Sequence, residues 1–163
     1  MRVAAALLAL AALSGCGLRP LYGGAESASR TMLGSVQVAP IEGQQGWLVS
    51  KELRDRFSAV DGGTPRYRLE VKLDDDITGL GVRRDDAITR ERRTLRARYQ
   101  LVDLANGQVV LDATAGSDAG IDVVGSEYAT IAAEQSALER LAGIVADQIV
   151  ARLALYAERN AKQ

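Results

Sequence analysis

Strict alternation of apolar and polar residues in the middle of the chain constrains the fold more than any other feature. "RYRLEVKLD" has apolar residues at every second position, and "TLRARYQLVD" repeats the pattern. Because successive side chains of a strand point to opposite faces, both segments predict strands with one buried face. Asn106-Gly107 tolerates positive φ and predicts a turn into a third strand, "QVVLDATAG". The residues predicted to point inward are Tyr67, Leu69, Val71, Leu73, Leu95, Ala97, Tyr99 and Leu101.

The flanking segments predict a short strand and two helices. "SVQVAP" alternates up to Pro40, and "GWLVSKELRDRFSAV" places Val49, Leu53, Phe57 and Val60 at helical spacing. From about Glu127 to Ala157, apolar residues recur every three, four or seven positions after Ser126, a candidate N-cap. The order strand-helix-strand-strand-strand-helix predicts an α+β fold, with two helices on one face of a four-stranded mixed sheet. The expected single domain spans 35–158, followed by a tail at 159–163.

The N-terminal segment has the layout of an export signal. Arg2 precedes an unbroken run of Ala, Val and Leu, which is too short to span a bilayer as a helix. Leu13-Ser14-Gly15-Cys16 resembles the bacterial lipobox, so we expect a signal peptide over 1–15, lipidation of Cys16 and a tether over 16–34 rich in Gly and small residues. The alternatives are an ordinary secretory signal and a buried free thiol.

The absence of histidine restricts the kinds of catalytic and metal site that the chain could form. With His 0 and a formal net charge of −1, the sequence excludes histidine-based catalysis and gives no sign of a nucleic-acid binder. We expect no enzyme, no cofactor and no metal. Consecutive strand residues alternate in direction, so Asp74 to Asp76 indicates an acidic strand end rather than a cation cage. A hydrolase using these residues, Asp85 or Asp86 is the weakest alternative.

Arginines are concentrated between residues 83 and 98. Arg92, Arg96 and Arg98 share the outward face of the predicted strand, where guanidinium groups could bind a phosphorylated amphiphile or an acidic protein wall. The alternative is a solvated face whose charges prevent aggregation at the sheet edge. The candidate residues for such a contact are Arg83, Arg84, Arg90, Arg92, Arg96 and Arg98.

Two smaller features lie beside these elements. Gly79 to Val82 lacks the strand and helix that a phosphate-binding loop requires, and it is interpreted as a hairpin tip. Trp47 and Phe57 are interpreted as core or docking residues rather than as a ligand cage.

Several segments resemble the LptE family of lipopolysaccharide-assembly lipoproteins, in its alphaproteobacterial form. They are "GCGLRPLYG", "GWLVSKELRDRF", "ITRERRTLRARYQLVD" with "NGQVV", and "VVGSEYATIAAEQSALERLAGIVADQIVARLALY". Leu18 departs from the pattern, which has an aromatic residue there.

The resemblance implies an outer-membrane lipoprotein that plugs the lumen of the LptD β-barrel and supports its assembly. The pair would deliver lipopolysaccharide to the cell surface, with no catalysis, and the domain would lie on the periplasmic side and within the barrel. The alternative function is a periplasm-facing lipoprotein that acts as an adaptor or scaffold for another envelope complex.

Overall fold

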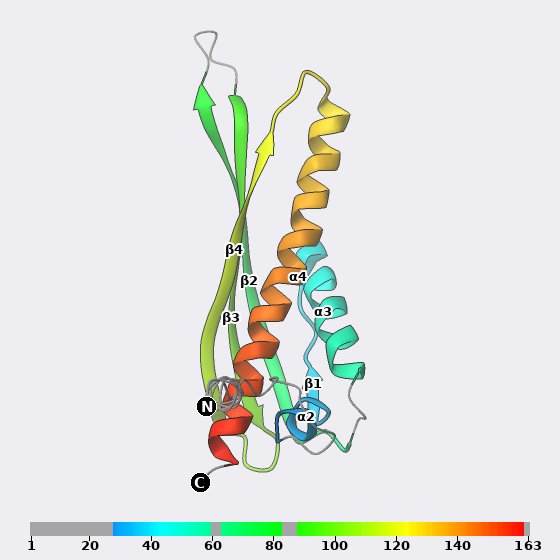
Figure 1. Ribbon diagram of the computed structural model, residues 1–163, viewed down its shortest axis with the longest axis vertical. Coiled ribbons are helices and arrows are strands. Elements are labelled where there is room, and N and C mark those ends of the chain that lie inside the picture. Colours follow the sequence, from blue (N-terminus) through cyan, green and yellow to red (C-terminus); the bar gives the residue numbers. More distant parts are fainter. Residues whose placement is uncertain (1–27, 60–62, 83–87, 162–163) are drawn as a thin grey trace, which may run out of the picture.

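A layer of long, twisted strands packs against a layer of helices (Figure 1). The computed structural model describes residues 28–59, 63–82 and 88–161. In chain order the elements are α2 (Ala28–Leu33), β1 (Val36–Val38), α3 (Gly43–Ser58), β2 (Tyr67–Val82), β3 (Ile88–Asp103), β4 (Val109–Asp122) and α4 (Glu127–Asn160). The predicted α+β class, with α3 and α4 on a four-stranded mixed sheet, is confirmed.

The strands lie side by side in the order β1-β2-β3-β4. β1 is parallel to β2 and pairs only with Tyr67 to Leu69, whereas β2, β3 and β4 form an antiparallel meander. The parallel pair requires a crossover, which α3 supplies between β1 and β2.

The two central strands are longer than the sequence predicts. β2 and β3 each have 16 residues, and the prediction of a hairpin tip at Gly79 to Val82 is wrong, because Leu80 pairs with Arg90 and Val82 with Ile88. Glycine weakens a strand on its own, yet continuous pairing with β3 keeps this segment extended. The connection itself falls within 83–87, outside the described residues.

Alternation along the strands divides the sheet into two faces, as predicted. We call the face toward the helices the inner face, and the opposite one the outer face. On β3, Leu95, Ala97, Tyr99 and Leu101 are at most 1% exposed and lie on the inner face. Burial in this apolar layer also raises the pKa of the Tyr99 hydroxyl. The even-numbered residues of β3 therefore point to the outer face.

The turn between β3 and β4 contains the predicted Asn-Gly pair. Gly107 has φ 71° and donates its N–H to the Asp103 carbonyl at 2.8 Å. This positive φ explains why glycine stands there. The register then shifts by one residue between Leu101 and Val102, so a bulge follows the turn.

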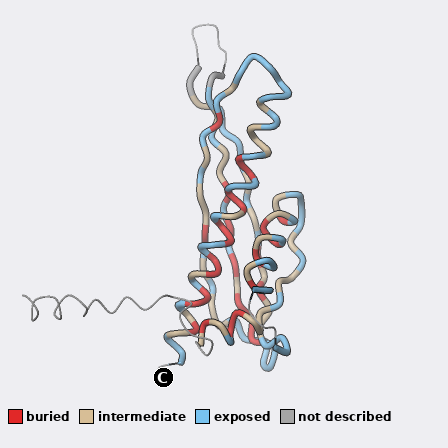
Figure 2. Tube along the Cα trace, turned by 45° about the vertical axis from the view of Figure 1, so that its right-hand side comes forward, coloured by how far each residue is buried: buried red, intermediate tan, exposed pale blue. Residues whose placement is uncertain are grey.

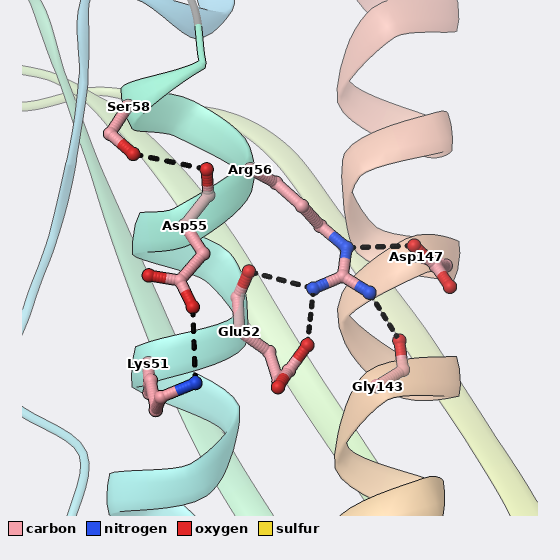
Figure 3. Close-up of polar contacts among 7 residues, drawn as sticks. All are labelled: Lys51, Glu52, Asp55, Arg56, Ser58, Gly143 and Asp147. Atoms are coloured by element: carbon pink, nitrogen blue, oxygen red, sulfur yellow. Dashed lines mark hydrogen bonds and ion pairs between the residues drawn. The ribbon is translucent and has the colours of Figure 1, made fainter.

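An arginine joins the two long helices (Figure 3). Arg56 of α3 donates Nε–H to Asp147 Oδ1 at 2.7 Å and Nη2–H to the Gly143 carbonyl at 3.2 Å, both on α4. Its Nη1 donates to Glu52 Oε2 at 2.6 Å within α3. The hydrogen bond to Asp147 is the main cause of a raised Arg56 pKa. This contact fixes α3 beside α4 while their apolar faces pack together.

A short helix, α2, was not predicted. Residues 28–33 fall in the segment expected to be tether, yet Ser29 and Leu33 are 0% and 1% exposed and α2 packs on α4. The Ser29 N–H also donates to Glu158 Oε1 at 3.4 Å. Six residues are too few for a stable isolated helix, so packing explains its presence. The folded body therefore begins before Ser35.

Other predictions about the helices are partly met. Phe57 is 7% exposed and belongs to the core, whereas Trp47 is 62% exposed. Ser126 occupies the N-cap position of α4, but its side chain makes no capping hydrogen bond. Val60 lies outside the described residues.

Buried residues are concentrated toward one end of the molecule (Figure 2). We call the half with α2, the β3–β4 turn and the C-terminal turns of α4 the proximal half, and the half where α4 begins the distal half (Figure 1). In α4 no residue before Ala137 is buried. The hydrophobic core is therefore mainly proximal.

Candidate functional site

Strand geometry places four of the predicted arginines in one row. Arg90, Arg92, Arg96 and Arg98 occupy even positions of β3 and are exposed on the outer face. Arg83 and Arg84 lie outside the described residues, as does Cys16. The structure thus brings together the arginines predicted to share a face, along the strand next to the β4 edge.

Each of three arginines in this row is paired with an aspartate of β4. Arg98 Nη2 lies 2.9 Å from Asp112 Oδ2, Arg96 Nη2 lies 3.1 Å from Asp118 Oδ2, and Arg90 Nε lies 2.9 Å from Asp122 Oδ1. We call these three ion pairs the outer ladder. Such cross-strand pairs at an exposed surface stabilise a sheet weakly and set its register.

Glycine at position 116 lets the Arg96 side chain, which forms the middle ion pair of the outer ladder, lie across β4. A Cβ built on Gly116 would come within 2.5 Å of the Arg96 Cδ and 2.9 Å of the Leu95 carbonyl oxygen. From this position the Arg96 guanidinium also donates to the Ser117 carbonyl at 3.1 Å. Any side chain at 116 would displace Arg96 from the ladder.

The ladder alters the acidity of its members. The hydrogen bond from Arg98 is the largest cause of a lowered Asp112 pKa, and the same contact raises the pKa of Arg98. The pKa of Asp118 is lowered first by the Thr94 hydroxyl and then by Arg96. Both aspartates therefore remain ionised to a lower pH than an isolated carboxyl group.

Charges on the outer face balance. The even positions of β2, β3 and β4 carry six cations and six anions. The cations are Arg68, Lys72, Arg90, Arg92, Arg96 and Arg98, and the anions are Glu70, Asp74, Asp76, Asp112, Asp118 and Asp122. Arg92 and Lys72 make no ion pair with a described residue, while the other four cations do. A phosphate could bind Arg92 or Lys72 without displacing a carboxylate.

One arginine of the cluster lies on the inner face. Arg93 donates to both oxygens of Asp75, at 2.8 and 2.6 Å, and to the Glu134 carbonyl of α4 at 3.0 Å. The side chains of Arg93 and Asp75 are each 12% exposed. The pair is the main cause of a raised Arg93 pKa. We call this contact the inner clamp, because it ties β2 and β3 to α4.

Two absences among the described residues bear on the site. Among residues 28–59, 63–82 and 88–161, no group of three or more His, Cys, Asp or Glu could hold a metal ion. In the same part of the chain, no helix is both long enough and apolar enough to cross a membrane. Asp74 to Asp76 instead point alternately to opposite faces, with Asp75 in the inner clamp.

The sequence interpretation missed the acidic half of the ladder. Asp112, Asp118 and Asp122 share the parity of one strand face in "LDATAGSDAGID", which is a visible signal. Their partners depend on the register after the turn, and the bulge shifts that register by one residue. The sequence interpretation also left Arg93 unassigned, although its parity is that of the inward residues Leu95 and Ala97.

Comparison with known proteins identifies the family. The family model for LptE, described as lipopolysaccharide-assembly, matches residues 33–153. The chain belongs to the LptE family. This match covers α3, the whole sheet and most of α4. No curated protein matched the chain in sequence.

Solved structures of lipoproteins have the same fold as this LptE family member. A candidate lipoprotein from Caulobacter crescentus CB15 is 27% identical, with a TM-score of 0.66 over 83% of this chain and 97% of that one. The rare lipoprotein B from Shewanella oneidensis is 11% identical, with a TM-score of 0.58 over 79% and 98%. A minor lipoprotein from Acinetobacter baumannii is 14% identical, with a TM-score of 0.58 over 74% and 91%.

Proposed function

We propose that this LptE family member is an outer-membrane lipoprotein, anchored through lipidated Cys16, that plugs an LptD-type β-barrel and helps it assemble. The pair would pass lipopolysaccharide to the cell surface. The family match over residues 33–153 carries this proposal. The balanced outer face supports it, because the lumen of a membrane barrel is polar and would be matched by mixed charges.

The outer face is the surface we assign to this role. In the proposal the outer ladder faces the barrel wall, where its ion pairs remain intact and present a polar surface with no net charge. Arg92 is the arginine of the row that is free to bind a lipopolysaccharide phosphate, since the other three hold aspartates. Arg83 and Arg84 remain candidate contacts beyond the described residues.

The first experiment is purification of the C-terminally tagged protein from outer membranes in mild detergent. The expected result is a large β-barrel in equal amount, together with a mature N-terminus at lipidated Cys16, both identified by mass spectrometry. Lipidated protein without a barrel would overturn the plug role. An unmodified Cys16 would overturn the anchor.

A charge swap tests the outer face specifically. Arg98→Glu places like charges together at Asp112 and should reduce the co-purified barrel by roughly tenfold or more. The double variant Arg98→Glu/Asp112→Arg restores the pair and should restore the barrel. Equal amounts of barrel with the single variant and the unmodified protein would remove the ladder from the interface.

Arg92→Ala separates lipopolysaccharide binding from barrel binding. This exposed arginine makes no hydrogen bond or ion pair with a described residue, so its loss should leave the fold and the barrel unchanged. Lipopolysaccharide retained by the purified complex, measured by phosphate content, should fall. Unchanged phosphate would remove Arg92 from the binding surface.

A further inference from the structure

The two edges of the sheet differ in the described contacts made to their backbone groups. On the β4 edge, the Gln148 side chain from α4 accepts the Gly116 N–H at 2.9 Å and donates to the Gly116 carbonyl at 3.3 Å. On the β2 edge, β1 pairs only as far as Leu69. Beyond that residue β2 continues to Val82 with β3 on one side only.

Hydrogen bonds at the end of β1 show which groups face the β2 edge. Tyr67 donates its N–H to the Ser35 carbonyl at 3.1 Å, and the Leu69 carbonyl accepts from Ala39 at 2.9 Å. Odd residues of β2 therefore turn their backbone toward this edge. The next ones are Val71, Leu73, Asp75 and Ile77, whose edge-facing N–H and C=O groups have no partner among the described residues. We call Val71 to Ile77 the open edge.

The surface is hollowed where β1 ends. The last hydrogen bond of this pairing is the one from Ala39, and from Pro40 the chain turns away toward α3. A depression of about 700 Å³ lies between the 40–45 segment and the start of the open edge, lined by Val71, Lys72 and Leu73 on the strand side. A second hollow of about 420 Å³ adjoins it along Glu70 to Lys72. An extended chain therefore has room to lie beside β2.

Side chains along the open edge define what such a chain should carry. On the inner face Leu73 is half-buried and Ile77 is 40% exposed, so apolar surface remains to be covered. On the outer face Asp74 and Asp76 are exposed carboxylates without an ion pair among the described residues. Directly opposed strands favour opposite charges and apolar pairs on their respective faces. The complementary strand alternates apolar residues with Lys or Arg.

A second copy of this chain is the wrong partner. Two open edges paired antiparallel about Asp75 would set the Asp74 and Asp76 carboxylates of one copy against those of the other. Like charges directly opposite destabilise a sheet, and charged residues at an edge are a common defence against self-association.

We propose that the open edge binds an extended segment of a partner protein, in which apolar residues alternate with Lys or Arg, as an added β-strand. The site goes beyond the proposed plug function, because it uses backbone groups at the sheet edge rather than the outer ladder. Main-chain hydrogen bonds supply the affinity, and the acidic positions select the basic segment.

The test uses the full chain labelled with ¹⁵N and two synthetic peptides, KVKVKVK and EVEVEVE. With KVKVKVK, the amide signals of Val71, Leu73 and Asp75 should shift and their hydrogen exchange should slow by about tenfold. Amides of Lys72 and Asp74 already bond to β3, and the Gly116 amide already bonds to Gln148, so their exchange should change little. This alternation distinguishes an added strand from non-specific charge attraction.

A charge-reversed protein supplies the matched control. Asp74→Lys/Asp76→Lys should exchange the preference between the two peptides by about tenfold, with the edge amides still responding. Equal binding of both peptides to both proteins, or a response centred on β4, would overturn the proposal. So would edge amides that are protected without peptide and released on dilution, because a second copy would then cover the edge. Failure of the barrel purification leaves these results unaffected.

Discussion

The proximal and distal halves of the molecule have the same strands but different means of cohesion. In the proximal half α2, α3 and α4 enclose an apolar layer in which Leu53, Leu101 and Leu153 are 0% exposed. In the distal half Tyr128 and Ile131 of α4 are 87% and 54% exposed, and the inner clamp joins sheet to helix. The difference shows that a long sheet need not be buried evenly. The proximal half stabilises the fold, which leaves the distal surface free for contacts.

The largest expected effect tests whether packing in the proximal half dominates the free energy of unfolding. Leu101→Ala removes a fully buried side chain and should lower the free energy of unfolding by roughly 3 to 5 kcal/mol. Ile131→Ala, its distal counterpart, should change that free energy by less than about 0.5 kcal/mol. Urea denaturation of the two variants measures both values. Similar losses would mean that the distal turns of α4 also contribute to the core.

The inner clamp is the next largest test. Arg93→Met leaves the Asp75 carboxylate nearly buried without its partner, so the free energy of unfolding should fall by about 3 kcal/mol. Replacing both residues, as Arg93→Met/Asp75→Leu, should recover most of that loss.

Arg92→Met is the matched control for the clamp, because this neighbouring arginine is exposed and makes no hydrogen bond or ion pair with a described residue. Its effect should stay within about 0.5 kcal/mol. If Arg92→Met and Arg93→Met cost the same, the clamp would not be what joins β2 and β3 to α4. Urea midpoints with unchanged slopes provide the measurement.

Variants of Gln148 test how its side chain, which lies on α4, holds the Gly116 backbone of β4. Gln148→Ala removes both hydrogen bonds to the Gly116 backbone and should cost about 1 kcal/mol. The Gly116 amide should then exchange faster, while Gln148→Glu, which keeps an acceptor for that N–H, should show a smaller change. An unaltered exchange rate in the alanine variant would show that α4 covers the β4 edge without this side chain.

Acid should weaken the ion pairs of the outer ladder in both halves. Of the four predictions in this comparison, this one has the smallest expected effect. The folded-state pKa values of Asp112 and Asp118 are lowered, so the stability that their ion pairs contribute is complete above the unfolded-state pKa of about 4 and is lost as pH falls through the lowered folded-state values. Asp112→Asn/Asp118→Asn should flatten the stability curve in that range.

Glu139→Gln is the control for the acid experiment, since it removes an exposed carboxylate from the middle of α4 that makes no ion pair among the described residues. It should leave the acid limb of the curve as it is in the unmodified protein. An unchanged curve for the double asparagine variant would mean that the ladder does not contribute to folding stability.

The sequence predicted what depends on periodicity and missed what depends on register. Alternation was enough to assign Leu101 to the core and Arg98 to the outer face, because side-chain direction has a period of two residues. The partnership of Arg98 with Asp112 depends on the turn and on a bulge, which shift the pairing by one residue. No local signal in the chain specifies that shift.

Length was the other limit of prediction. Gly79 and the acidic residues before it resemble the end of a strand, yet pairing with β3 extends β2 to Val82. The six residues of α2 are helical because Leu33 packs in the core, which local propensity does not reveal. Both cases are tertiary contacts overriding weak local preferences.

The contact between α2 and α4 also constrains the order in which parts of the chain can fold. Ser29 bonds to Glu158, a residue 129 positions later in the chain, so the first described helix packs against the last one. During synthesis the meander of β2, β3 and β4 can pair while the chain is still growing, because its contacts are between neighbours in sequence. α2 must wait for the final turns of α4 before it can dock. A chain that stopped at Ala151 would still contain every described strand but would leave α2 without a place to dock.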